Sequence, residues 1–304
     1  MKKLIVLAII MGVMVLVAAL AHAQAPANDL KPTFISPTPG LYVNGWPAFT
    51  VSYPKEWVEQ PLVLPVEVYR AAPPAWPNDP AFIVRSFAGP ADISGSADLL
   101  VGFLGQQGYK DIKVLYDKPS QLQDGTPARE AELEWVYPGG PKVNTFMVAT
   151  KKDDVWIMAT LTSARMIGDD LKSIAYSLKV PRGKQEPVKV PPDVQAFLDK
   201  FCSDVNSGDA GRIMTNYSDR YLDHGMGKAR MEQWYRSDPQ SPIQSGITSA
   251  DVTLTIFEPQ GNKAYLAGFF GGKLKSGAPC LASPINNNQL IKENGQWRWY
   301  GNQK

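Results

Sequence analysis

The sequence contains 304 residues, 44% of them hydrophobic, and its formal net charge at pH 7 is +2. Lys2 and Lys3 supply the whole excess, and the chain from residue 24 onward is formally neutral. A chain without a basic excess lacks the electrostatic surface that binds nucleic acid or anionic lipid, so we expect neither as a partner.

Residues 1–23 have the pattern of a secretory signal peptide. Lys2 and Lys3 precede an unbroken run of 17 apolar residues, Leu4–Leu20, and Ala21-His22-Ala23 provides a small-residue cleavage site. We expect cleavage near Ala23 and a periplasmic or secreted protein. The apolar run also reaches the lower length limit of a membrane-spanning helix, about 17 residues, so retention as a membrane anchor is the alternative.

Residues 24–46 are predicted to form a Pro-rich tether. Four prolines fall between Pro26 and Pro39, and no hydrophobic periodicity accompanies them. This composition favours an extended segment without packed structure.

Residues 47–180 are predicted to form a first domain, an antiparallel sheet with covering helices. Period-two alternation of apolar residues indicates strands, and spacings of three and four indicate helices. The expected strands lie around residues 49–53, 66–68, 82–84, 129–137, 142–150 and 155–162, and the expected helices around residues 94–109 and 169–178. An antiparallel sheet accommodates this order without parallel crossover connections.

Three carboxylates alternate along one of these strands. Glu130, Glu132 and Glu134 would share one strand face, opposite a row of apolar side chains. They suggest a cation site, but period-two spacing places them in a row, whereas a metal ion needs ligands that converge. We therefore expect a solvated strand face.

Two short segments of this domain resemble the PsbP-like family. The first is Phe49-Thr50-Val51-Ser52-Tyr53-Pro54-Lys55-Glu56-Trp57, an "F-x-V-x-Y-P-x-x-W" pattern, and the second is the "Asp-Asp-x-x-x-Ile-x-x-Ser-Leu" pattern at residues 169–178. The resemblance covers about 130 residues. It implies a non-enzymatic interaction module.

Residues 181–192 are rich in Pro and charge and are predicted to be an extended linker. A second domain follows at residues 193–304. Its first helix carries apolar residues at spacings of three and four, and Asn206-Ser207-Gly208-Asp209 ends that helix and begins the next. Period-two strands follow Gly246, and Asn294-Gly295 between the last two predicts a tight hairpin.

Three helices followed by a curved antiparallel sheet resemble the nuclear transport factor 2-like superfamily, including its SnoaL-like branch, a cystatin-like α+β fold. Residues 194–219 and the closing segment 293–300 carry the resemblance. It implies an overall α+β class and a cone-shaped cavity between helices and sheet. Some members use this cavity for catalysis, and many others use it for ligands, partners or self-association.

The candidate polar residues of that cavity are Tyr217, Tyr221, Asp223 and His224. An Asp-His pair could move a proton near neutral pH, and a ketosteroid-isomerase-like site needs a Tyr and a carboxylic acid. However, adjacent residues in an extended segment point to opposite sides, so Asp223 cannot readily orient His224. We expect His224 to be a loop or surface histidine and expect no catalytic residue here.

Aromatic side chains are the other candidates. Trp234, Tyr235, Trp297 and Trp299 could line an apolar pocket, since Trp297 and Trp299 share a strand face. The same spacing also suits a packed core, so pocket lining and core packing both stay open.

Only two cysteines occur, Cys202 on the first predicted helix of the second domain and Cys280 in a Gly/Pro loop. An even count in an exported protein favours one disulfide between them. Two buried thiols, or a redox pair without a CxxC motif, are the alternatives.

Motifs for cofactors and metals are lacking. The sequence has no P-loop, no Rossmann glycine fingerprint, no G-x-S-x-G elbow and no zinc-ligand spacing. We therefore expect no cofactor and no metal site. Together these observations predict an exported, non-catalytic protein of the bacterial envelope that binds a small apolar ligand or a protein partner. The alternatives are an isomerase or hydratase that uses the second cavity, and a structural subunit that forms homodimers.

Overall fold

The computed structural model describes residues 39–303 except for residues 64–65, 76–78, 89–91, 137–138, 153–154, 240, 276 and 278–282. The predicted signal peptide, most of the predicted tether and Cys280 lie outside the described residues. In the described part of the chain, no helix combines the length and apolar character needed to cross a bilayer.

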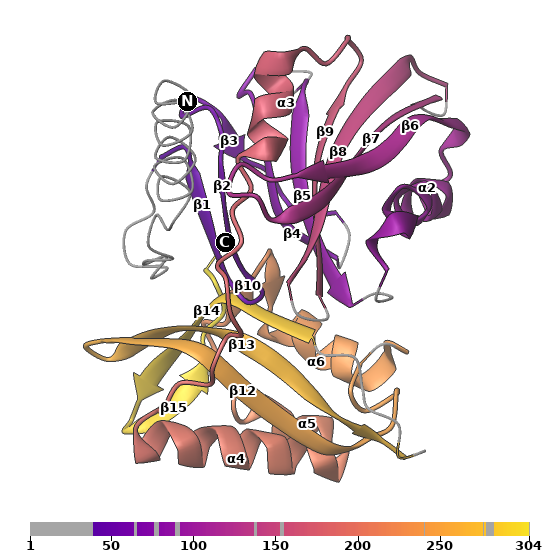
Figure 1. Cartoon of the computed structure of the whole chain (residues 1–304). Helices are drawn as coiled ribbons and strands as arrows, with labels where there is room; N and C mark the ends of the chain where they lie inside the picture. Colours follow the sequence, from indigo (N-terminus) through magenta and orange to yellow (C-terminus); the bar gives the residue numbers. More distant parts are fainter. Residues whose placement is uncertain are drawn as a thin grey trace, which may run out of the picture.

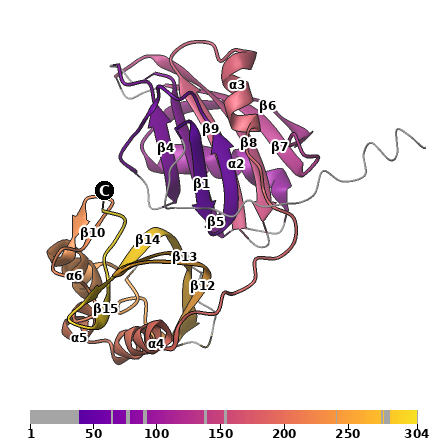
Figure 2. The same ribbon diagram turned by 90° about the vertical axis from the view of Figure 1, so that its left-hand side faces the viewer.

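The chain folds around two antiparallel sheets that lie on either side of the predicted linker (Figures 1 and 2). The larger sheet has the strand order β3-β4-β5-β9-β8-β7-β6. Its strands are β3 (Val58–Glu59), β4 (Glu67–Ala72), β5 (Ala81–Ala88), β6 (Lys110–Gln121), β7 (Pro127–Val136), β8 (Lys142–Lys152) and β9 (Val155–Ser163). Helices and antiparallel sheets in one chain confirm the α+β class.

Each face of the larger sheet is covered by a helix. One face packs against α3 (Asp169–Tyr176) through a cluster that includes Phe82, Phe146 and Leu161, and the other packs near η1 (Ile93–Gly95) and α2 (Ser96–Gln106). The alternation predicted for β7 produces this division, since Ala131, Leu133 and Trp135 all belong to the cluster near α2.

The three carboxylates of β7 do not form a cation site. Glu132 pairs with Lys172 of α3 at 3.1 Å, and Glu130 pairs with Lys118 at 2.9 Å. Glu134 pairs with Lys142. Among the described residues, no group of three or more potential ligands converges on a point.

A separate hairpin, β1 (Leu41–Gly45) and β2 (Ala48–Ser52), lies beside α3 (Figure 1). The predicted tether at residues 24–46 is therefore wrong at its end, because residues 41–45 form β1. These residues are ordered by backbone pairing with β2 and by Tyr42, whose ring stacks on Tyr69 at 4.1 Å between centroids. The pairing with β2 is local, but Tyr69 lies on β4, and the composition of residues 24–46 gives no signal of that contact.

The smaller sheet has the order β12-β13-β14-β15 and is packed against three helices. Its elements are α4 (Pro192–Ser207), α5 (Ala210–Met214), β10 (Leu222–Asp223), β11 (Met226–Gly227), α6 (Lys228–Ser237), β12 (Ile247–Gln260), β13 (Lys263–Leu274), β14 (Ser283–Glu293) and β15 (Gln296–Trp299). The pairing of β12 with β13 shifts register at Leu254/Ile256, and that of β13 with β14 shifts at Leu266/Gly268. The two shifts lie side by side in the sheet, because Leu254 pairs with Gly268. Bulges of this kind bend strands and increase twist, which allows the sheet to curve over the helices.

Local signals account for the ends of several elements in this part. Pro192 occupies the first turn of α4, and Gly208 ends the helix in the left-handed conformation at φ 69°. Asp209 caps α5 by accepting from two backbone N–H groups. The predicted Asn294-Gly295 turn is confirmed, because Glu293 pairs with Gln296 and both turn residues have positive φ.

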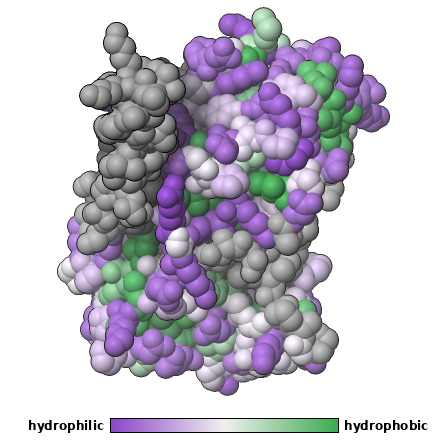
Figure 3. All heavy atoms as spheres, viewed as in Figure 1, coloured by the Kyte–Doolittle hydropathy of each residue, from purple (hydrophilic) through white to green (hydrophobic). Residues whose placement is uncertain are grey.

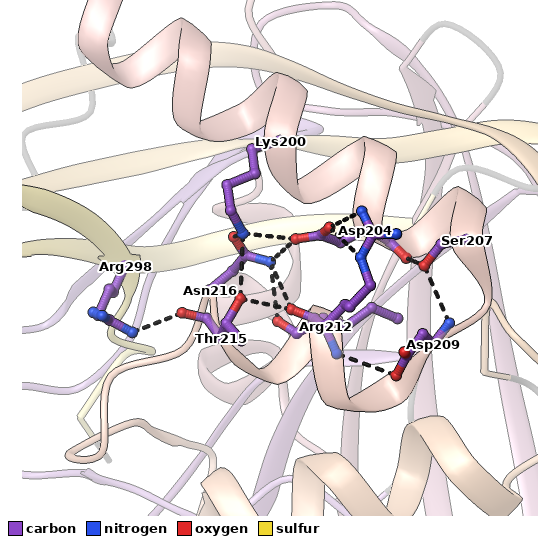
Figure 4. A network of polar contacts seen from close by, with 9 residues as sticks. Lys200, Asp204, Ser207, Asp209, Arg212, Thr215, Asn216 and Arg298 are labelled. Carbon is purple, nitrogen blue, oxygen red and sulfur yellow. Dashed lines mark hydrogen bonds and ion pairs between the residues drawn. The ribbon is translucent and has the colours of Figure 1, made fainter.

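A buried carboxylate connects α4 to α5 and to the segment that follows α5 (Figure 4). Asp204 is 3% exposed and accepts from Lys200 Nζ at 2.7 Å, Arg212 Nη2 at 2.9 Å and Asn216 Nδ2 at 2.9 Å. Asn216 in turn accepts the backbone N–H of Trp299 at 2.8 Å. The network therefore fixes where the end of β15 lies relative to the helices.

The two sheets are joined by the tip of the β1–β2 hairpin as well as by the linker. Gln185 Nε2 donates to Gly45 O at 2.7 Å, and the ring of Trp46 lies 4.9 Å from that of Phe269 on β13. Within the linker, Val188 N–H donates to Leu254 O on β12. On the face seen in Figure 3, hydrophilic side chains predominate, interrupted by smaller apolar areas on both parts.

Candidate functional site

A cavity of about 200 Å³ lies between the curved sheet and the helices of the C-terminal part. Most of its lining is aromatic or aliphatic. The lining residues are Phe201, Tyr217, Tyr221, Met231, Trp234, Tyr235, Pro242, Ser245, Ile247, Phe270, Pro284, Ile285, Asn288 and Trp299. The structure thus brings five predicted candidates to one cavity: Tyr217, Tyr221, Trp234, Tyr235 and Trp299.

Phe201 lies at the centre of the aromatic contacts of this cavity. It projects from the apolar face of α4, and its ring meets Trp299 edge-on at 5.4 Å and Phe270 at 6.2 Å. Tyr217 meets the same ring at 6.3 Å. Edge-to-face packing of this kind fixes ring orientations, so the walls of the cavity are defined by rings from a helix, two strands and a loop.

Two tyrosine hydroxyls form a buried pair at the cavity. Tyr217 Oη and Tyr235 Oη are 3.0 Å apart, so one O–H donates to the other oxygen and the second proton is free for another acceptor. Burial raises the pKa of Tyr235 to about 12 and raises that of Tyr217 as well. Both hydroxyls are therefore protonated at neutral pH and act as neutral hydrogen-bonding groups.

Trp299 presents a buried donor without a partner. Its side chain is 5% exposed, and its Nε1 has no hydrogen-bond partner in the described part of the chain. The indole N–H can only donate. Leaving a buried donor unpaired costs about 1–3 kcal/mol, so this group stands out from an otherwise well-packed lining.

Asp223 and His224 lie at the turn between β10 and β11, and neither is among the residues that line the cavity. Asp223 Oδ1 accepts the backbone N–H of Asn302, and His224 Nε2 is 3.0 Å from Asn302 Nδ2. Burial raises the pKa of Asp223, an effect that the neighbouring His224 opposes. His224 is exposed with φ 46°, so its contacts serve to hold the C-terminal segment.

Trp297 and Trp299 lie two residues apart on β15 but have different environments. Trp297 Nε1 donates to Asp193 Oδ2 at 2.8 Å, near the start of α4, and Lys292 Nζ lies 5.4 Å from the centre of its ring. Trp297 is therefore outside the cavity lining, although it shares a strand face with Trp299. Trp234 lines the cavity and packs against Tyr235 at 5.0 Å.

Sequence reasoning missed part of the lining. Phe270 continues the alternation of Ala264, Leu266 and Gly268, so extending that pattern by two residues would have found it. Pro284, Ile285 and Asn288 had no such signal, because the first half of β14 is polar and its register with β13 shifts.

The predicted disulfide is not shown by the structure. Cys202 is half-buried and has no disulfide partner among the described residues, and Cys280 lies outside them. Burial raises the pKa of the Cys202 thiol to about 12, helped by the carboxylates of Asp251 and Asp199. Such a thiol is a poor nucleophile at neutral pH.

A second, more open depression is lined by Asp219, Arg220, Glu293, Asn294 and Arg298. Its charges are already paired, since Arg220 contacts Glu293 at 2.9 Å and Lys228 contacts Asp219 at 2.7 Å. The aromatic cavity is therefore the better candidate for a ligand site.

No protein-family model matches this chain, and no curated protein matches it. Among solved structures, cyanobacterial PsbP (CyanoP) from Synechocystis sp. PCC 6803 is 16% identical, with a TM-score of 0.38 over 50% of this chain and 98% of that chain. A protein from Bacteroides thetaiotaomicron VPI-5482 is 9% identical, with a TM-score of 0.35 over 86% and 89% of the two chains. The Saccharomyces cerevisiae Ran-binding protein Mog1p is 10% identical, with a TM-score of 0.33 over 43% and 89%.

These values amount to weak similarity of fold. The resemblance to the PsbP-like family that the sequence predicts is supported only as weak similarity of fold. The resemblance of residues 193–304 to the nuclear transport factor 2-like superfamily stays a prediction.

Proposed function

We propose that this chain is an exported, non-catalytic binding protein of the bacterial envelope and that its C-terminal cavity binds a small apolar ligand. The aromatic cavity of about 200 Å³ is the observation that carries the proposal. In this view the cavity belongs to a nuclear transport factor 2-like fold, and the N-terminal PsbP-like part serves as an interaction module. The predicted signal peptide at residues 1–23 supports export to the bacterial envelope.

The size of the cavity indicates the size of the ligand. An apolar cavity of about 150 Å³ in another protein is large enough to bind benzene. The present cavity, at about 200 Å³, therefore suits a single substituted ring. Its walls of Phe, Tyr and Trp rings provide apolar contact area for such a ligand.

The arrangement favours binding over catalysis. An isomerase or hydratase would need a proton-transferring group within hydrogen-bond reach of the ligand. The sequence candidates were Tyr217, Tyr221, Asp223 and His224. Asp223 and His224 contact Asn302 at the β10–β11 turn. Tyr217 and Tyr221 line the cavity, but burial raises the pKa of both, so they are neutral hydroxyls at pH 7. The residues described as lining the cavity include no carboxylate, imidazole or thiol.

Isopropylbenzene, a purely apolar single ring, tests the binding function by ligand-observed NMR with the purified full chain. We expect saturable binding to the wild type and at least about tenfold weaker binding to Ile285→Phe, because the larger side chain fills the cavity. Leu115→Phe is the matched control, since Leu115 is exposed on β6. No binding to the wild type, or equal binding to Ile285→Phe, would refute the proposal.

Export is tested separately by intact mass of the protein recovered from the envelope of an expressing bacterium. We expect a mature chain that begins at Gln24. A chain that keeps residues 1–23 and stays with the membrane fraction would support the anchor instead.

Light scattering at high micromolar concentration tests the alternative of a homodimer. A monomer at that concentration would exclude it.

A further inference from the structure

We propose that the aromatic cavity selects a ring compound with a neutral oxygen acceptor, such as a carbonyl group, and that Asn288 Nδ2 donates a hydrogen bond to this oxygen. The inference rests on the proposed binding function and adds the chemical class of the ligand and the residue that selects it. It follows from the direction, the hydrogen bonding and the surroundings of one side chain on β14.

The side chain of Asn288 lies on the face of the smaller sheet that packs against the helices. Asn288 pairs with Leu266 of β13, and the side chains of two paired residues lie on the same face. Leu266 belongs to the core cluster between this sheet and the helices. Leu290, two residues beyond Asn288 on the same strand, belongs to that cluster as well. Asn288 accordingly lines the cavity, which lies between the sheet and the helices.

The two asparagines that precede Asn288 turn the other way. Asn286 Oδ1 accepts the backbone N–H of Trp46 at 3.4 Å, and Asn287 Nδ2 donates to Tyr42 Oη at 3.3 Å, so both side chains contact the β1–β2 hairpin. Asn287 has φ 47° and lies where the pairing of β13 with β14 shifts register. A bulge of this kind re-aims side chains. Of the three consecutive asparagines, only Asn288 is among the residues that line the cavity.

The side-chain amide of Asn288 is a donor that a ligand can reach. Its Oδ1 accepts the backbone N–H of Gln289 at 2.9 Å, which identifies the oxygen and turns the two N–H groups of Nδ2 away from that backbone group. Nδ2 has no hydrogen-bond partner in the described part of the chain. Unlike the unpaired Nε1 of Trp299, it is not fully buried, and the residue as a whole is half-buried.

The rest of the lining favours a neutral acceptor over a charged one. No Lys, Arg, His, Asp or Glu is among the residues described as lining the cavity. A ligand carboxylate would lose its water without gaining a counter-ion, which is far more costly than desolvating a carbonyl group. A ring that carries a neutral oxygen therefore matches both the aromatic walls and the amide of Asn288.

The test compares acetophenone with isopropylbenzene, which have nearly the same shape but differ in the carbonyl oxygen. Dissociation constants of both probes are measured by ligand-observed NMR for the wild type and for Asn288→Leu, which keeps the approximate shape of the side chain and removes its donors. The two probes leave water at different cost, so the informative quantity is the ratio of their constants in the wild type divided by that ratio in the variant. We expect this quotient to favour acetophenone by about 3- to 10-fold.

Asn286→Leu is the matched control. It makes the same substitution on the same strand, but Asn286 contacts the β1–β2 hairpin and is not among the lining residues. We expect its quotient against the wild type to be close to one. A quotient close to one for Asn288→Leu as well, with both probes still bound, would overturn this inference and leave the binding function intact. If neither probe binds the wild type, the binding function itself fails.

A second measurement does not depend on the folding of a variant. In ¹⁵N-labelled wild type, a side-chain N–H resonance of Asn288 should move downfield on addition of acetophenone, and much less on addition of isopropylbenzene. Equal movement with both probes, or none with acetophenone at saturation, contradicts the proposed hydrogen bond.

Discussion

The ring of Trp46 lies 4.9 Å from the ring of Phe269, which places the tip of the β1–β2 hairpin against β13 of the smaller sheet. Successive side chains of a strand point to opposite faces. Phe270, the next residue, accordingly lines the cavity on the other side of β13. The contact between the two parts of the chain and the ligand site thus lie on opposite faces of β13.

The first prediction concerns this contact. Trp46→Ala removes a half-buried ring that packs on Phe269, and we expect the free energy of unfolding to fall by about 1–3 kcal/mol. Hydrogen exchange of the amides at the hairpin tip should also accelerate. Urea unfolding and native-state exchange measure the two effects. Met166→Ala is the control, because Met166 is 86% exposed. Unchanged exchange at the hairpin in Trp46→Ala would contradict the role assigned to the contact.

Elements with strong local signals were predicted from the sequence. The first helix of the C-terminal part has an apolar face at spacings of three and four, a proline at its start and Gly208 at its end, and α4 matches it closely. The turn at Asn294-Gly295 depends on two residues that tolerate positive φ, so it too is determined locally. Most strands of the larger sheet followed from simple alternation.

Elements with irregular alternation, and environments set by distant residues, were missed. β6 is an edge strand with register shifts at Lys110/Lys113 and Val114/Tyr116, which interrupt the alternation that identifies a strand. Consecutive exposed residues Val114 and Leu115 add to the irregular pattern. Trp297 and Trp299 have the same spacing signal, and only the position of Asp193 on α4 separates their environments. No local pattern contains that information.

A second prediction follows from the buried carboxylate of Asp204. Burial by itself raises its pKa, but hydrogen bonds from Lys200, Asn216 and Arg212 outweigh burial, and the pKa lies below its ordinary value. A depressed pKa in the folded state means that the carboxylate stabilises the fold above the unfolded value, about 3.9. This contribution is lost as the pH falls through the folded pKa.

Asp204→Asn should therefore lower the free energy of unfolding by about 1–2 kcal/mol at pH 7, since the donors lose a charged acceptor. The difference from the wild type should shrink as the pH falls below 4. Urea titrations at pH 7, 5 and 3 provide the measurement. Asp199→Asn, an exposed position on the same helix, should change stability by less than about 0.5 kcal/mol. A difference for Asp204→Asn that is independent of pH would argue against the carboxylate's charge as the cause.

The third prediction concerns the two cysteines. A free Cys202 thiol reacts slowly with iodoacetamide in the native protein, because its pKa is raised to about 12. Alkylation is therefore done in urea without reductant, on protein recovered from an oxidising compartment. The sequence predicts a disulfide between Cys202 and Cys280, so we expect no alkyl group in the intact mass before reduction and two after it. Two alkyl groups without reduction would contradict the disulfide.

The last prediction separates steric collision from backbone strain at two glycines. Gly301 has φ 81°, and a Cβ built there would lie 2.1 Å from Leu222 O, whereas Gly208 has φ 69° and a Cβ there would meet nothing within 4 Å. Gly208→Ala should cost about 1 kcal/mol, the usual penalty for an alanine in the left-handed region. Gly301→Ala has to displace the backbone of β10 as well, and we expect a loss above about 2 kcal/mol. Because Leu222 N–H donates to Tyr300 O, the hydrogen exchange of that amide should also accelerate in Gly301→Ala but not in Gly208→Ala. Equal losses of stability in the two variants would show that the close approach of the C-terminal segment to β10 is not what requires glycine at position 301.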